Sequence, residues 1–241
     1  MDWVKDFYSR TGSWWGPAEA RVTDRDHRRA ARLREHAGEG PKRVLELGSG
    51  YGTTAAALAE AGHTVTAVEL SDRVRFGAGL ADGRVTVVNE DFYTVRLPRE
   101  FDVVAYYNGF GVGTDADQRR LLTRIAAEWL RPGGVALIDV FNPFGWAAWH
   151  GHEEHRLPDP AAGYAHELRE VTTFDPVTCT ATDTWWRVDR PGERISQVLR
   201  CYTPADLRLL LEGTGLRLDS IDGFERDEAE YLAVLSPEDN P

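Results

Sequence analysis

The sequence of residues 44–71 is VLELGSGYGTTAAALAEAGHTVTAVELS, and this stretch decides the fold. The apolar run over 43–47 predicts a short strand, and the alanine-rich run over 53–61 predicts a helix that ends at Gly62. A second strand is predicted over 63–70, where most residues are β-branched or apolar. A strand, a turn, a helix and a second strand in this order indicate a protein that alternates β and α elements.

The turn after the first strand carries three alternate glycines, Gly48, Gly50 and Gly52. Glycine lets the backbone approach a ligand closely, and the first N–H groups of the following helix attract negative charge. Glu69 ends the second predicted strand, where a carboxylate can accept hydrogen bonds from both hydroxyls of a ribose. The turn and the acid together therefore predict a ligand that contains a ribose.

The same alternation continues along the chain. Further strands are predicted at 84–89, 101–107 and 135–141, and a helix at about 117–130. The strands are continuously apolar, as expected for a parallel sheet that helices cover on both faces. In such a sheet the ligand binds at the carboxyl ends of the strands.

The alternation stops after the fifth strand. Residues 178–188, TCTATDTWWRV, alternate with a period of two, and turn residues flank them, so we predict three antiparallel strands over about 164–201. A helix from Thr203 and strands at 216–221 and 231–235 then complete a seven-stranded sheet. We predict one α/β domain over residues 1–241, Rossmann-like and mostly parallel. An N-terminal helical lid over 1–37 and an antiparallel β cap inserted at 144–201 complete it.

The overall charge argues against nucleic acid as a partner. The chain has 28 Lys and Arg but 39 Asp and Glu, a formal net charge of −11, whereas nucleic-acid and anionic-membrane surfaces attract basic patches. The arginines between Arg21 and Arg34 alternate with acids and suggest a solvated helix face. No apolar run approaches the roughly eighteen residues that span a bilayer. We expect a cytoplasmic monomer or homodimer, with Cys179 and Cys201 reduced.

These motifs resemble those of the class I S-adenosylmethionine-dependent methyltransferases. The resemblance is close over about 40–141 and rests on four stretches: ELGSGYG from Glu46, the acid Glu69, NEDF at 89–92 and YYNGF at 106–110. It implies S-adenosylmethionine as the cofactor and S-adenosylhomocysteine as the product, with the methionine part near the first motif, the ribose on Glu69, and the adenine beside Asp91 and Phe92. The cofactor-binding residues that it implies are Glu46, Gly48, Ser49, Gly50, Gly52, Thr53, Glu69, Leu70, Asp91, Phe92, Tyr107 and Asn108.

The methyl acceptor is expected to be a small molecule, an aromatic or amine-bearing metabolite. The fourth strand ends without the Asn/Asp-Pro-Pro-aromatic sequence of methyltransferases that act on nucleic-acid amines. Aromatic residues instead gather in the N-terminal segment and the insertion, and aromatic walls suit a flat or cationic ligand. The acceptor-binding residues that we predict are Tyr8, Trp14, Trp15, Asn108, Phe110, Trp146, Trp149, Trp185 and Trp186.

Methyl transfer is an in-line substitution that depends mainly on positioning. A base is needed only when the acceptor must lose a proton, and His150 and His152 are the candidates. The surrounding GHEEH run lacks the His-Glu-x-x-His spacing of zinc enzymes, so we predict no metal.

Two alternatives remain open from the sequence. A nicotinamide-dependent oxidoreductase would use a similar turn and acid, although the glycine spacing suits it poorly. A binding protein that kept the nucleoside pocket but lost catalysis would bind the cofactor without turnover.

Overall fold

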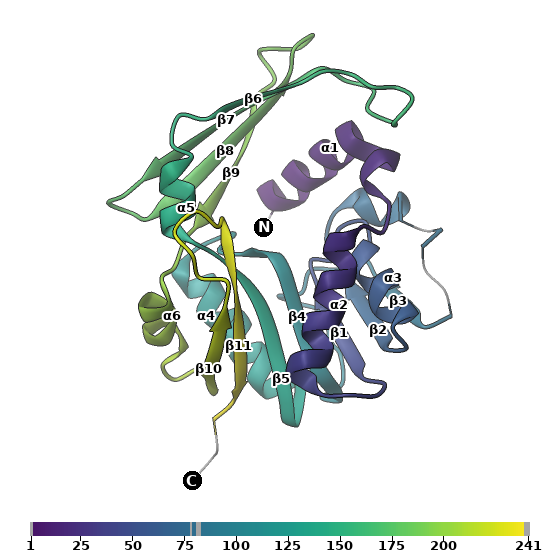
Figure 1. Cartoon of the computed structure of the whole chain (residues 1–241), viewed down its shortest axis with the longest axis vertical. Helices are drawn as coiled ribbons and strands as arrows, with labels where there is room; N and C mark the ends of the chain where they lie inside the picture. Colours follow the sequence, from purple (N-terminus) through teal and green to yellow (C-terminus); the bar gives the residue numbers. More distant parts are fainter. Residues whose placement is uncertain (1, 78, 81–82, 239–241) are drawn as a thin grey trace.

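The computed structural model describes residues 2–77, 79–80 and 83–238. Its centre is a seven-stranded sheet in the order β10-β11-β5-β4-β1-β2-β3 (Figure 1). The strands are β1 (Arg43–Leu47), β2 (Thr64–Val68), β3 (Val85–Val88), β4 (Phe101–Phe110), β5 (Leu130–Phe141), β10 (Leu216–Asp222) and β11 (Glu230–Pro237). Strands β1 to β5 are parallel, and β11 runs antiparallel to both β5 and β10. The predicted Rossmann-like, mostly parallel sheet is confirmed.

Helices cover both faces of this sheet, α2 and α3 on one side and α4 and α6 on the other (Figure 1). Their bounds are α2 (Asp24–Ala37), α3 (Thr53–Glu60), α4 (Asp115–Arg124), continued by the π-helical turn η2 (Ile125–Trp129), and α6 (Pro204–Leu211). On the first face, Ala30 and Leu33 of α2 pack with Leu58 of α3 against the apolar side chains of β1 and β2. The core therefore forms two layers, one on each side of a sheet whose strands are apolar on both faces.

A second sheet is inserted after β5 and α5 (Pro143–Ala148). Its strands are β6 (Glu153–Arg156), β7 (Leu168–Asp175), β8 (Thr180–Arg187) and β9 (Ile195–Arg200), paired antiparallel in this order. We predicted three antiparallel strands here. The fourth, β6, is short and polar, with the sequence EEHR, and so lacks the apolar alternation from which the others were predicted.

The two helices of the predicted lid segment, residues 1–37, have different surroundings. Helix α1 (Asp2–Glu19) lies between the large sheet and the inserted sheet (Figure 1). Its Phe7 and Trp14 pack against Leu168 and Trp185 of the inserted sheet. Helix α2 instead belongs to the layer on the large sheet, because its apolar stripe is buried there. Of the two helices, only α1 lies between the two sheets (Figure 1).

Strand β5 begins at Leu130, earlier than the predicted start at 135. Leu130 pairs with Phe101 and Val135 pairs with Val103, so the turn Arg131–Gly134 is a register shift inside one strand rather than a loop before it. Within the residues that the structure describes, no helix has both the length and the apolar character to cross a membrane.

Candidate active site

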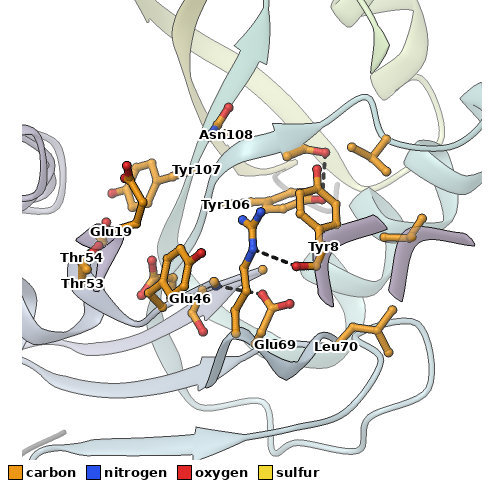
Figure 2. Close-up of a pocket in the computed structure, with 18 of the residues that line it drawn as sticks. Tyr8, Glu19, Glu46, Thr53, Thr54, Glu69, Leu70, Tyr106, Tyr107 and Asn108 are labelled. Carbon is orange, nitrogen blue, oxygen red and sulfur yellow. Dashed lines mark hydrogen bonds between the residues drawn. The ribbon is translucent and has the colours of Figure 1, made fainter. Parts of the chain in front are cut away.

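A cavity of about 460 Å³ lies at the carboxyl ends of β1, β2 and β4, between the large sheet and α1. Figure 2 shows residues of the cofactor motifs, among them Glu46, Glu69 and Leu70, around the same cavity as Tyr8 of α1. The predicted cofactor-binding residues all line it except Gly52, which faces a small neighbouring pocket. One cavity therefore joins the cofactor motifs to the aromatic N-terminal helix.

The glycine-rich turn after β1 forms the floor of the cavity. Gly48 and Gly50 have φ angles of 61° and 57°, a conformation that residues with a Cβ rarely adopt. A Cβ on Gly48 would also lie 3.1 Å from the ring of Tyr106. Glycine at these positions thus permits the turn and leaves the space above it open to a ligand.

Glu69 follows β2, and its carboxylate links the glycine-rich turn after β1 to Ser71. Its Oε2 accepts a hydrogen bond from the N–H of Gly50 at 2.8 Å, and its Oε1 accepts from the N–H and the hydroxyl of Ser71 at 2.8 and 2.6 Å. The side-chain amide of Asn89 donates to the main-chain oxygen of Glu69 at 2.7 Å. Both carboxylate oxygens are therefore held in place at the cavity wall.

The next part of the wall comes from the segment after β3. Asp91 accepts a hydrogen bond from the N–H of Tyr93 at 2.8 Å, which fixes its carboxylate. The ring of Phe92 packs at a centroid distance of 5.5 Å from the ring of Tyr106. A carboxylate and an aromatic ring therefore lie next to each other in the cavity wall.

A group of largely buried charged side chains adjoins the cavity near the ends of β1 and β4. The guanidinium of Arg29 donates to Asp139 at 2.9 Å and lies 4.6 Å above the centre of the Tyr107 ring. The Glu46 carboxylate is 3% exposed, and its Oε2 has no hydrogen-bond partner. Burial raises the pKa of Glu46 to about 8 although Arg29 opposes the shift, and the nearby Asp26 and Glu69 raise it further. One carboxylate oxygen of this buried acid is thus free to meet a ligand in the cavity.

The raised pKa of Glu46 has a consequence for stability. A carboxyl group whose pKa is higher in the folded than in the unfolded protein stabilises the fold fully below about pH 4.5, and this contribution is lost as the pH rises through about 8. We expect the free energy of unfolding in urea to fall between pH 5 and pH 8.5, and to fall less in Glu46→Gln. Glu60→Gln, which changes an exposed acid of α3, is the control and should keep the wild-type slope. Equal slopes for Glu46→Gln and the wild type would contradict the assignment.

The upper wall of the cavity is aromatic and carries two arginines. Trp15 and Trp185 pack edge to face with ring centroids 5.0 Å apart, and the indole N–H of Trp15 has no partner. Arg73 lies 4.8 Å from the ring centre of Tyr8, and its Nε donates to the main-chain oxygen of Tyr8 at 3.1 Å. Arg156 of β6 lies 5.9 Å from the ring centres of both tryptophans. Helix α1, the segment after β2 and the inserted sheet therefore meet at this wall.

Four of the predicted acceptor-binding residues line the cavity: Tyr8, Trp15, Asn108 and Trp185. The other five do not. Trp14 is buried in the cluster with Phe7 and Leu168, and Phe110 lies in the core of the large sheet. Trp186 points to the other face of β8, where Arg194 covers it at 4.1 Å.

The aromatic and histidine side chains that follow β5 lie elsewhere as well. Trp146 packs against Phe141, and Trp149 is 46% exposed. His150 accepts a hydrogen bond from the N–H of Phe174 at 3.0 Å, and the ring of His152 lies 6.0 Å from that of Trp149. Trp146 belongs to α5 and the other three residues to the turn between α5 and β6, and none of them lines the cavity. Neither histidine is therefore placed to act as a base there.

Several cavity residues were missed in the sequence, and five of them are charged. They are Glu19, Arg25, Arg29, Arg73 and Arg156. The arginines of α2 were predicted to be solvated, yet Arg29 is paired with Asp139, and Asp26 is fully buried. Asp26 accepts hydrogen bonds from the hydroxyls of Thr53 and Thr54 at 3.0 and 2.7 Å. The sequence TDRD at 23–26, typical of a helix N-terminus, signalled the position of Asp26 but not its burial.

Metal binding has no support in the part of the chain that the structure describes. There, no three His, Cys, Asp or Glu side chains gather closely enough to hold an ion.

Known proteins resemble the chain over most of its length. The profile of a family described as "Methyltransferase domain" matches residues 21–221. The cypemycin N-terminal methyltransferase of a Streptomyces species is 30% identical over 224 residues, 80% of this chain and 82% of that protein.

Two solved structures share the fold. The CcbJ methyltransferase from Streptomyces caelestis has a TM-score of 0.74 and 23% identity, over 97% of this chain and 96% of that one. The sugar N-methyltransferase KedS8 from Streptoalloteichus has a TM-score of 0.62 and 22% identity, over 90% and 86%.

Proposed function

The chain belongs to the class I S-adenosylmethionine-dependent methyltransferases, and from this premise we propose that it methylates the nitrogen of a small-molecule amine. The observation that carries the proposal is that one cavity holds both the cofactor motifs and an aromatic wall. Membership in this family argues against the nicotinamide-dependent oxidoreductase that the sequence left open. We also propose that α1 and the inserted segment 144–201 form the lid over the acceptor.

The residues of the cavity suit S-adenosylmethionine, the cofactor of this family. We propose that Glu69 accepts hydrogen bonds from the ribose hydroxyls, and that Asp91 and Phe92 hold the adenine. The unpartnered Oε2 of Glu46 fits the amino group of the methionine part, and the guanidinium of Arg25 or Arg29 fits the carboxylate of that part. When bound, the cofactor supplies a methyl group on a positively charged sulfur, and that group passes to a nucleophile while sulfur keeps the electron pair of the broken bond.

An amine suits the rest of the cavity better than a hydroxyl does. An uncharged amine attacks with its own lone pair and loses a proton to water only afterwards, whereas a hydroxyl needs a base. The described cavity wall contains no histidine, and burial raises the pKa of the Tyr8 phenol to about 12, which keeps it protonated. The cypemycin relative is named as an N-terminal methyltransferase, which also supports nitrogen as the acceptor atom. The net charge of −11 supports a free small molecule rather than a nucleic acid.

Methyl transfer to matched compounds tests the proposal. The protein is incubated with S-adenosylmethionine and pairs of aromatic metabolites that differ only in carrying an amine or a hydroxyl, and the products are identified by mass spectrometry. We expect N-methylated products and at least tenfold slower methylation of the hydroxyl partners. Products methylated only on oxygen, or no turnover despite cofactor binding, would contradict the proposal.

The aromatic wall should affect the affinity for the acceptor but not the affinity for the cofactor. In Trp15→Leu we expect the KM of the best amine to rise about tenfold while the Kd of S-adenosylhomocysteine stays within twofold, because Trp15 faces the acceptor side of the cavity. Trp149→Leu changes an exposed tryptophan outside the cavity and should change neither value. Loss of affinity for both ligands in Trp15→Leu would mean that this side chain only holds the lid together.

A further inference from the structure

A chain of hydrogen bonds runs from the cavity into the inserted sheet. The Tyr8 hydroxyl, which lies at the cavity, donates to Oε1 of Gln197 at 2.9 Å. Nε2 of Gln197 donates to Oδ2 of Asp183 at 3.1 Å, and the hydroxyl of Thr172 donates to Oδ1 of Asp183 at 2.9 Å. Figure 2 shows Tyr8 among the cavity residues. None of the other three residues lines the cavity.

The register of the inserted sheet holds these groups together. Asp183 of β8 lies directly opposite Thr172 of β7 and directly opposite Gln197 of β9. Side chains at opposite positions share one face of the sheet and lie within hydrogen-bonding reach. Asp183 is 4% exposed and Thr172 is 1% exposed, so water does not compete for their contacts. The arrangement is therefore built into the pairing of three strands.

The charge of Asp183 sets the direction of every hydrogen bond in the chain. An ionised carboxylate only accepts, so Gln197 must turn its NH₂ group toward Asp183 and its oxygen toward Tyr8. Glu170 is hydrogen-bonded to Asp183, and burial together with the charges of Asp183 and Glu154 raises the pKa of Glu170 to about 8. Burial also raises the pKa of Asp183, but its hydrogen bonds with Gln197, Thr172 and Glu170 oppose that rise. Glu170 therefore holds the proton of this pair, and Asp183 accepts hydrogen bonds from its neighbours.

The Tyr8 hydroxyl must in turn donate to Gln197, because the amide oxygen cannot donate. Its only proton is used in that bond, so its oxygen faces the cavity as an acceptor alone. An uncharged primary or secondary amine can donate an N–H to this oxygen and still keep its lone pair free for the methyl group. A neutral tertiary amine has no N–H to donate.

We propose that Gln197 and Asp183 are positioning residues that make Tyr8 a hydrogen-bond acceptor, so that the site selects amines that still carry an N–H. The proposal rests on the amine acceptor proposed above. It implies that methylation of a primary amine stops at the tertiary amine. Removal of either positioning residue frees the Tyr8 proton to turn toward the amine lone pair and block it.

Equilibrium binding to the protein saturated with S-adenosylhomocysteine tests the proposal. The probes are N-methylaniline and N,N-dimethylaniline, two flat amines that are uncharged at pH 8 and differ in having or lacking an N–H. We expect the wild type to bind N-methylaniline about tenfold more tightly, the usual effect of one well-placed hydrogen bond. In Gln197→Met, Asp183→Asn and Tyr8→Phe the preference should fall below about threefold. The double variant Tyr8→Phe with Gln197→Met should show no further change, because both act through one hydroxyl.

The control is Ser196→Ala, which removes a hydroxyl that pairs with Thr184 at 2.8 Å on the outer face of the same strand. It should keep the tenfold preference. If Asp183→Asn does not fold, the other two variants carry the test, since neither residue is fully buried. A preference that survives in Gln197→Met but is lost in Tyr8→Phe overturns the positioning role and leaves the amine acceptor standing. A wild type that shows no preference, or that binds neither probe, overturns the amine acceptor as well.

Discussion

Replacing Glu69 by alanine is expected to lower the affinity for S-adenosylhomocysteine about a hundredfold. A carboxylate that accepts hydrogen bonds from two ribose hydroxyls makes two charge-assisted contacts, and about 1.5 kcal/mol for each amounts to roughly a hundredfold in Kd. The same carboxylate holds the N–H of Gly50 at 2.8 Å, so the glycine-rich turn also loses a contact. Calorimetric titration measures the Kd, and the rise in Tm that saturating ligand causes in the wild type should nearly vanish.

The matched control for this variant is Glu90→Ala, which removes an exposed acid from the turn after β3. Its Kd should stay within twofold of the wild-type value. A Glu69→Ala protein that melts like the wild type without ligand and binds S-adenosylhomocysteine with unchanged affinity would remove the basis for placing the ribose there.

Replacing Arg29 by methionine is expected to lower the free energy of unfolding by about 3 kcal/mol, the lower end of the range for breaking a buried ion pair. The side chains of Arg29 and Asp139 are 13% and 10% exposed. Without the guanidinium, the buried acids Asp139, Glu46 and Glu230 lose the charge that partly offsets their burial. Urea unfolding without ligand at pH 7.5 measures the loss.

The pH dependence gives this prediction a second check. Removing the positive charge raises the pKa values of the neighbouring acids further, and stability that depends on such protonated acids is lost as the pH rises. The destabilisation by Arg29→Met should therefore be larger at pH 8.5 than at pH 5. Arg28→Met changes an exposed arginine of the same helix and should cost less than about 0.5 kcal/mol at either pH. An equally small loss in Arg29→Met would show that the buried acids need no counter-charge.

Much of the fold and of the cofactor side of the cavity could be predicted from the sequence. The strand, turn and helix around Gly48 and Gly50 depend on neighbouring residues, since a left-handed turn needs glycine and a buried strand needs an apolar run. In a parallel sheet the carboxyl ends of all strands meet at one edge. Glu69 and Asp91 therefore had to approach this turn once their strands were located.

The acceptor side was decided by tertiary structure. Trp14 and Trp15 are adjacent in the sequence, and so are Trp185 and Trp186, yet only one of each pair lines the cavity. The choice depends on how α1 and β8 are rotated against the large sheet, because adjacent side chains of a helix or strand point in different directions. A local pattern does not contain that rotation.

The polar and charged contacts were also decided by tertiary structure, because their partners lie far apart in the sequence. The partner of Arg29 lies 110 residues away, and Tyr8 reaches Gln197 across 189 residues. Composition and helix pattern made the arginines of α2 look solvated, because sequence alone cannot show which acids the folded sheet brings beside them. The sequence by itself determined the Rossmann-like sheet and the cofactor motifs, which rest on backbone geometry and local periodicity. The packing of α1 and the inserted sheet decided which aromatic side chains line the cavity and which distant residues they reach.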